Sequence, residues 1–217
     1  MKRLPSRLVA LTPGTLEPAH VERFLHSASR AIAAGLDSVL VREPGLSDRA
    51  VLELALALRA RLDARETPGL DARGNAWLGL HDRAHLAHAA RADGVHLGFR
   101  SLPPSEARRV VGAEVALGFS AHAGDELEPW AASDYLVLGP VFDTPSKRGW
   151  KEPLGLAGFA RELARAPVPV WALGGIRAQN APEVLALGAR GVAVRGALLE
   201  AADPEAAARA LLDATAR

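Results

Sequence analysis

The stretch Ala92-Asp93-Gly94-Val95-His96-Leu97-Gly98 is one of four similar phrases in the sequence, each of which joins a short turn to a short apolar run. The other three lie at residues 35–42, 133–139 and 189–195. In each phrase the turn stands where a helix would end and the next strand begin. A phrase that recurs at every second apolar run is what a strand and helix unit repeated eight times would produce. The sequence therefore predicts a (β/α)8 barrel.

Eight short apolar runs are spread along the chain, and most lack the alternation of a half-exposed strand. They lie at residues 7–11, 38–42, 77–81, 94–97, 115–120, 135–139, 169–173 and 191–194. Between them, the apolar stripe of residues 20–34 predicts a helix, and Asn180 and Asp203 are predicted to open two more. The main alternative is an open doubly wound sheet, but residues 11–14 lack its GxGxxG turn. We therefore expect one (β/α)8 barrel domain over residues 1–217.

The composition of the 217 residues is that of a globular chain, with 49% hydrophobic and 24% charged residues. The formal net charge of +1 gives no general attraction to nucleic acid or to an anionic membrane, so neither is expected as a partner. The absence of cysteine excludes disulfides and thiolate chemistry and fits a cytoplasmic protein. The sequence contains no stretch typical of a signal peptide or a membrane span. Related barrels suggest a homo-oligomer.

Polar residues gather at the carboxyl ends of the predicted strands, which is where barrels of this kind place their active sites. Gly174 and Gly175 follow the seventh strand, and Arg195 and Gly196 follow the eighth. Such positions often bind phosphate through backbone N–H groups, and glycine lets the anion approach the backbone closely. Two ordinary tight turns are the alternative. Because glycine-containing turns follow two consecutive strands, a phosphate site is favoured over this alternative.

The loop at residues 143–153 contains two of the three lysines of the chain. Its residues Thr144, Ser146 and Lys147 combine two hydroxyls with a compact ammonium group, which suggests contact with a phosphate or diphosphate; a solvated surface loop is the alternative. Asp82, after the third strand, is a candidate magnesium ligand, because Mg²⁺ is held by one or two carboxylates together with substrate phosphates. His96 lies within a strand, as either a satisfied core histidine or a proton-transfer group.

Motifs along nearly the whole chain resemble those of the thiamine phosphate synthase family and of its relatives, the TenI-type thiazole tautomerases. The pair Arg42-Glu43 resembles the end of the family's second strand, residues 92–98 are similar to its Ala-Asp-Gly-Val-His-Leu-Gly, and residues 120–122 are similar to its Ser-x-His. Residues 139–147 resemble its Gly-Pro-Val-Phe-x-Thr-x-Thr-Lys, and residues 172–176 and 191–194 match its phosphate end. The resemblance implies a barrel enzyme of thiamine biosynthesis that binds a thiazole phosphate.

Several positions depart from the synthase pattern. Leu40 and Pro44 stand where the synthase has Gln and Lys, and His81 replaces the Asn that precedes Asp82. Residues 99–101 read Phe-Arg-Ser where the synthase has the Gln-Asp-Asp that supplies a second magnesium carboxylate. A synthase must neutralise its diphosphate leaving group, so these losses favour a TenI-like tautomerase, which shifts a proton on a carboxythiazole phosphate and needs no metal.

The first hypothesis is therefore a tautomerase. Pro140 occupies the place of the histidine that TenI proteins can carry, so the base must come from elsewhere. The candidates are His122, His96 and His81, in that order of preference. Its phosphate would lie on Gly174, Gly175, Arg195 and Gly196. The alternative is a Mg²⁺-dependent synthase that joins hydroxymethylpyrimidine diphosphate to thiazole phosphate. Its diphosphate and metal would be bound by Arg42, Asp82, Ser120, Thr144, Ser146 and Lys147. A third hypothesis is a non-catalytic barrel that binds the phosphate ligand and reports on it to a partner protein.

Overall fold

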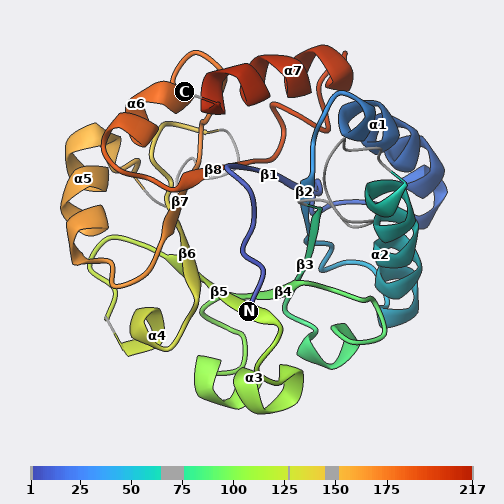
Figure 1. Cartoon of the computed structure of the whole chain (residues 1–217), viewed down its shortest axis with the longest axis horizontal. Helices are drawn as coiled ribbons and strands as arrows, with labels where there is room; N and C mark the ends of the chain where they lie inside the picture. The colour runs from blue at the N-terminus through green and yellow to red at the C-terminus, as the bar shows by residue number, and fades with distance from the viewer. Residues whose placement is uncertain (1, 65–75, 127, 145–151, 217) are drawn as a thin grey trace.

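Eight short, mostly buried strands pair in parallel and in chain order, and the eighth pairs with the first to close a barrel (Figure 1). The computed structural model describes residues 2–64, 76–126, 128–144 and 152–216. The strands are β1 (Leu8–Leu11), β2 (Ser38–Val41), β3 (Trp77–His81), β4 (Gly94–Leu97), β5 (Ala116–Ala121), β6 (Tyr135–Leu138), β7 (Val170–Leu173) and β8 (Gly191–Val194). The predicted (β/α)8 barrel is thus confirmed, with each strand inside or next to its predicted apolar run.

Helices surround the barrel as an outer ring (Figure 1). They are α1 (Val21–Ala33), α2 (Asp48–Asp63), α3 (Pro104–Val111), α4 (Glu128–Ala131), α5 (Gly155–Arg165), α6 (Ala181–Ala186) and α7 (Pro204–Thr215), with 3-10 helices η1 (Pro18–His20) and η2 (Ala84–Leu86). Asp203 caps α7 as predicted, because its carboxylate accepts hydrogen bonds from two N–H groups of the first turn. The alternation of strand and helix is broken between β3 and β4, where residues 82–93 form η2 and turns in place of an α-helix.

The structure explains why the sequence motif that predicted the barrel recurs before several strands. In two of its occurrences an aspartate carboxylate, placed just before a strand, accepts a hydrogen bond from the backbone of the preceding strand. Asp93 Oδ2 accepts from Leu78 N at 2.9 Å, and Asp134 Oδ2 accepts from Leu117 N at 2.8 Å. These side chains join the turn at the start of one strand to its neighbour in the sheet, so the same residue type recurs at equivalent turns.

Three aromatic rings fill the amino-terminal half of the barrel interior. The ring of Tyr135 packs edge-on between Trp77 and Trp171, with ring centroids 6.0 and 5.5 Å away, and all three side chains are fully buried. Glycines on adjacent strands leave room for the rings, because a Cβ at Gly118 would lie 2.1 Å from the Tyr135 ring and one at Gly94 would lie 2.5 Å from Trp77. This half of the barrel is therefore a packed core.

The segment before β1 crosses the amino-terminal mouth of the barrel (Figure 1). Its backbone carbonyls accept hydrogen bonds from the two indoles of the interior. Trp77 Nε1 donates to the carbonyl of Arg3 at 3.1 Å, and Trp171 Nε1 donates to that of Ser6 at 2.7 Å. Because this end is closed by chain and rings, a substrate reaches the interior from the carboxyl ends of the strands.

Candidate active site

Five of the predicted site residues lie at the carboxyl-terminal end of the barrel, because strand side chains alternate between inside and outside. Each of these residues either lies an even number of positions along the chain from a residue of the interior core, or pairs in register with a position that does. His81, His96 and Ser120 lie on the inner side, and Arg42 and Arg195 continue the same alternation one residue beyond the ends of β2 and β8. The sequence prediction that these side chains share one end of the barrel is supported by this register.

His96 lies at the floor of this end, where it is only 3% exposed. Its Nε2 is 2.9 Å from Oγ of Ser120, and its ring lies 5.9 Å from that of His81 and 5.7 Å from that of Tyr135. Burial, with a smaller contribution from the neighbouring His81, lowers the pKa of His96 to about 3. His96 is therefore neutral at physiological pH.

We expect acidification from pH 6.5 to pH 4.5 to destabilise the wild-type protein more than a His96→Gln variant. The unfolded chain binds a proton at His96 below its ordinary pKa of 6.5, whereas the folded chain does so only near pH 3. Protonation of His96 in the unfolded chain therefore lowers the free energy of unfolding as the pH falls below 6.5. The loss between pH 6.5 and pH 4.5 is about 2–3 kcal/mol. Urea unfolding at several pH values measures the difference, and parallel pH dependences of wild type and variant would refute it.

A hydrogen-bonded group of three side chains lies at the carboxyl ends of β3 and β4. Nδ1 of His81 lies 3.2 Å from Oδ2 of Asp82, and the Ser101 hydroxyl donates to Oδ1 of the same carboxylate. Ser101 Oγ also accepts a hydrogen bond from the backbone N–H of Gly98 at 2.6 Å. The hydrogen bond from His81 and then that from Ser101 lower the pKa of Asp82 to about 2, against the effect of burial. Asp82 is therefore a fixed carboxylate, and its hydrogen bond to His81 leaves Nε2 of that ring as a proton acceptor.

The fit of this group to Mg²⁺ is limited to one carboxylate. Among the described residues, no cluster of three or more His, Cys, Asp or Glu side chains is arranged to hold a metal ion. Asp82 is ionised and its side chain is 45% exposed, so it can supply one oxygen ligand. A magnesium ion here would need the oxygens of a bound diphosphate to complete its coordination.

Glu43, the second residue of the Arg42-Glu43 pair, has a structural role that the sequence did not reveal. It is 1% exposed, and its two carboxylate oxygens accept hydrogen bonds from the backbone N–H groups of Gly14 and Leu16, each at 2.8 Å. Thr12 is also fully buried, and its Oγ1 accepts a hydrogen bond from Arg42 N at 2.8 Å. The two side chains therefore hold the segment after β1 against the end of β2.

His122, the first of the three candidate bases, contacts its own loop. Its backbone N–H donates to Oδ2 of Asp125 at 2.8 Å, and its Nδ1 lies 3.5 Å from the same oxygen. His122 lies just after the end of β5, two residues beyond Ser120. His81 and His96, by contrast, are directly paired and have adjacent rings. The order of the three candidate bases stays a prediction.

The loop after β6 is described only in part. Thr144 is half-buried at the end of the described segment, whereas Ser146 and Lys147 lie outside the described residues. The proposed diphosphate contacts of these three residues therefore stay predictions.

Gly174 and Gly175 are required by packing against the segment after β6. Both have positive φ values, +101° and +64°. A Cβ at Gly174 would lie 2.6 Å from Cα of Pro140, and one at Gly175 would lie 2.6 Å from the carbonyl oxygen of Asp143. This close backbone approach explains the two glycines without a ligand, so phosphate binding at this turn stays a prediction.

The turn after β8 carries a half-buried Arg195 and an exposed Gly196. A Cβ at Gly196 would lie 3.0 Å from Oε2 of Glu200, so a carboxylate stands beside the turn. A phosphate bound directly on Gly196 would be repelled by Glu200. Arg195 is the better candidate for anion binding at this strand.

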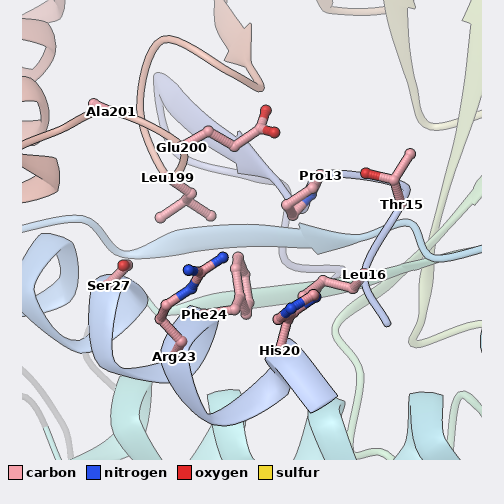
Figure 2. A pocket seen from close by; sticks show the side chains of 10 residues that line it. All are labelled: Pro13, Thr15, Leu16, His20, Arg23, Phe24, Ser27, Leu199, Glu200 and Ala201. Carbon is pink, nitrogen blue, oxygen red and sulfur yellow. The ribbon is translucent and has the colours of Figure 1, made fainter. Parts of the chain in front are cut away.

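A pocket of about 460 Å³ lies beside this turn, between α1 and the segments that follow β1 and β8 (Figure 2). Glu200 approaches it from the β8 side, and Arg23 and His20 approach it from the helical side (Figure 2). Its lining consists of Pro13, Thr15, Leu16, His20, Arg23, Phe24, Ser27, Leu199, Glu200 and Ala201. None of the predicted site residues lines it, so it is separate from the inward-facing group.

None of the helices in the described part of the chain is long and apolar enough to cross a membrane.

Comparison with known proteins supports the resemblance seen in the motifs. The family model described as thiamine monophosphate synthase (TMP-TENI) matches residues 8–198. The chain is 37% identical to a thiamine-phosphate synthase of Leptospira biflexa, over 83% of this chain and 85% of the relative. It is 38% identical to a thiamine-phosphate synthase of Mycobacterium tuberculosis, over 96% of this chain and 94% of the relative.

A solved structure, the thiamine phosphate pyrophosphorylase of Pyrococcus furiosus, superposes on the chain with a TM-score of 0.77. The two are 27% identical, and the match covers 99% of this chain and 96% of that structure. The match of the family model to most of the chain, together with relatives above 30% identity, shows the membership. The chain therefore belongs to the thiamine monophosphate synthase family of enzymes.

Proposed function

We propose that the chain is a thiamine-phosphate synthase, which joins hydroxymethylpyrimidine diphosphate to a thiazole phosphate and releases pyrophosphate. The names of its relatives support this reaction above the tautomerase that the residue losses favoured. The structural observation that carries it concerns Arg42 and Arg195, which lie on the inner side of the same barrel end. Neither has a carboxylate partner among the described residues, so both guanidinium groups are available for phosphate oxygens.

In this reaction the thiazole nitrogen forms a bond to the methylene carbon of the pyrimidine, and the bond from that carbon to the diphosphate oxygen breaks. Arg42 and the Ser120 hydroxyl would bind the diphosphate, and Arg195 would bind the thiazole phosphate at the β8 end. His96 orients Ser120 through their 2.9 Å hydrogen bond. Asp82 would hold the Mg²⁺ that the family implies, and the ion's chemical contribution would be to neutralise charge on the leaving diphosphate.

A carboxythiazole phosphate tautomerase is the second candidate, and the pairing of His81 with Asp82 favours it. An ionised carboxylate that holds Nδ1–H of a histidine orients the ring and leaves Nε2 to exchange a proton with a substrate. The replacement of a metal-binding carboxylate by Ser101 also fits a reaction that needs no metal. For this function His81→Asn would abolish turnover.

The test is to incubate the protein with both substrates and Mg²⁺ and to follow thiamine phosphate with and without EDTA. The synthase is supported if product forms and EDTA stops its formation. If no product forms while the protein binds thiazole phosphate and catalyses proton exchange on the carboxythiazole, the tautomerase replaces it. Binding with neither reaction would leave a non-catalytic barrel and would contradict both enzymatic proposals.

We expect Ser101→Asp to lower the Mg²⁺ concentration that gives half-maximal synthase activity, by about tenfold. The Ser101 side chain contacts Asp82, so the variant places a second carboxylate beside the first, and paired carboxylates bind a divalent cation more tightly. Ser105→Asp is the matched control, because it makes the same change of charge at an exposed position of α3, four residues further along the chain. An unchanged Mg²⁺ dependence in Ser101→Asp would show that Asp82 is not the ligand.

A further inference from the structure

Two buried polar atoms beneath the site have no hydrogen-bond partner among the described residues. They are Oη of Tyr135 and Nδ1 of His96, and their side chains are 1% and 3% exposed. A buried hydroxyl without a partner costs free energy that a phenylalanine at the same position would avoid. The presence of tyrosine at this position therefore needs an explanation.

The two atoms belong to one row of the barrel. His96 pairs in register with Gly118, and Gly118 pairs with Tyr135, so the three positions share the inner side of adjacent strands. A Cβ at Gly118 would lie only 2.5 Å from Oη of Tyr135. The tyrosine ring thus extends across the missing side chain of Gly118 toward His96, and the two ring centroids are 5.7 Å apart.

The protonation of both groups is fixed by their burial. Burial raises the pKa of Tyr135, which stays a hydroxyl and needs an acceptor. Burial keeps His96 neutral, so only one of its two nitrogens carries a proton and the other is an acceptor. Nε2 is engaged with Ser120, which leaves Nδ1 as the ring nitrogen without a partner in the row that it shares with Tyr135.

We propose that Tyr135 is a positioning residue that selects the Nε2–H tautomer of His96, by donating from its hydroxyl to Nδ1 through one buried water. The water would accept from Oη and donate to Nδ1, which satisfies both atoms. Nε2–H of His96 then donates to Oγ of Ser120. Ser120 keeps its own proton to donate to a phosphoryl oxygen, a consequence that rests on the proposed function. Without this bias, Ser120 could donate to Nε2 and would turn its lone pairs toward the anion.

The tautomer is measured by ¹⁵N NMR of histidine-labelled protein without substrate, with the His96 signals identified by their loss in His96→Gln. The expected spectrum shows His96 protonated at Nε2, with the Nδ1 resonance shifted toward the value of a hydrogen-bonded acceptor. Tyr135→Phe is expected to move Nδ1 toward the free-acceptor value. Protonation at Nδ1 in the wild type, or an unmoved Nδ1 resonance in the variant, would overturn the proposal.

Two further variants separate positioning from packing. Ser133→Ala removes another buried hydroxyl, one that bonds to Pro129 and lies two residues before Tyr135, and it should lower stability without moving the His96 signals. Because Tyr135 is the only tyrosine of the sequence, 3-fluorotyrosine changes this hydroxyl alone. Its more acidic hydroxyl is a stronger donor and should move Nδ1 in the direction opposite to Tyr135→Phe. An Nδ1 signal that ignores fluorination would also refute the proposal.

Pyrophosphate binding gives the readout at Ser120. Titration calorimetry is expected to show about fivefold weaker binding of inorganic pyrophosphate by Tyr135→Phe and unchanged binding by Ser133→Ala. If the NMR result holds while pyrophosphate binds to neither wild type nor variant, the tautomer assignment stands and the proposed synthase function fails. The two proposals are therefore tested separately.

Discussion

Replacement of Glu43 by alanine is expected to lower the free energy of unfolding by about 2–4 kcal/mol, although Glu43 belongs to a motif that resembles an active-site signature. The buried carboxylate accepts hydrogen bonds from the N–H groups of Gly14 and Leu16. Its removal leaves two donors without partners and an empty volume at the end of β2. Urea unfolding followed by tryptophan fluorescence measures the loss.

Two comparisons show whether these hydrogen bonds are the cause. Glu43→Gln keeps one acceptor oxygen but turns an amide toward the second N–H group, so it should lose roughly half as much stability as Glu43→Ala. Glu53→Ala removes an exposed carboxylate that pairs with Arg49 on α2, and it should change stability by less than about 0.5 kcal/mol. Equal stabilities of Glu43→Ala and Glu53→Ala would show that the segment after β1 does not depend on Glu43.

The fold could be predicted from the sequence because its decisive features are local. A parallel strand buried on both faces is a short apolar run whatever its partners are. The turn that precedes it repeats the same chemistry, as Asp93 and Asp134 show by binding the backbone of the preceding strand. The missing helix between β3 and β4 was not foreseen. Residues 82–93 form η2 and turns there, and Asp82 and Arg83 adopt positive φ values.

The site could be predicted only as far as strand alternation reaches. Arg42, His81 and Ser120 stand at the ends of apolar runs and must share the open end of a barrel. Which of these groups contact one another depends on strand register, which the sequence does not contain. The pairing of His81 with His96, and the contact of His122 with its own loop, could therefore not be predicted.

The residues that sequence reasoning missed are those whose partners are distant in the chain. Glu43 accepts hydrogen bonds from a segment more than 25 residues earlier, and Ser101 contacts Asp82 from the segment after β4. Tyr135 looked like one member of an apolar run, since nothing local distinguishes a core ring from one that reaches the site. The signal for Ser101 was present as a departure from the family pattern, but only its hydrogen bond to Asp82 shows what the hydroxyl does.

Arg42→Met is expected to reduce kcat/KM for thiamine phosphate formation by about 100-fold or more while leaving the fold intact. A guanidinium that faces a developing diphosphate charge in a partly desolvated site stabilises the transition state more than the ground state. Arg42 lies on the inner side of the barrel, and its positive charge is felt at the buried His96, whose pKa it helps to lower. Methionine keeps most of the volume of the side chain and removes only the charge and the donors.

A lysine at position 42 separates the effect of the positive charge from that of the planar guanidinium group. Arg42→Lys keeps the charge but loses the planar pair of donors, so its activity should fall between those of wild type and Arg42→Met. Arg49→Met makes the same substitution on the exposed face of α2 and should leave kcat/KM unchanged. Weaker product inhibition by pyrophosphate in Arg42→Met would place the effect at the leaving group. If Arg42→Met stays within threefold of the wild type, Arg42 does not contact the diphosphate, and the anion must be held by Arg195 and the segment after β6.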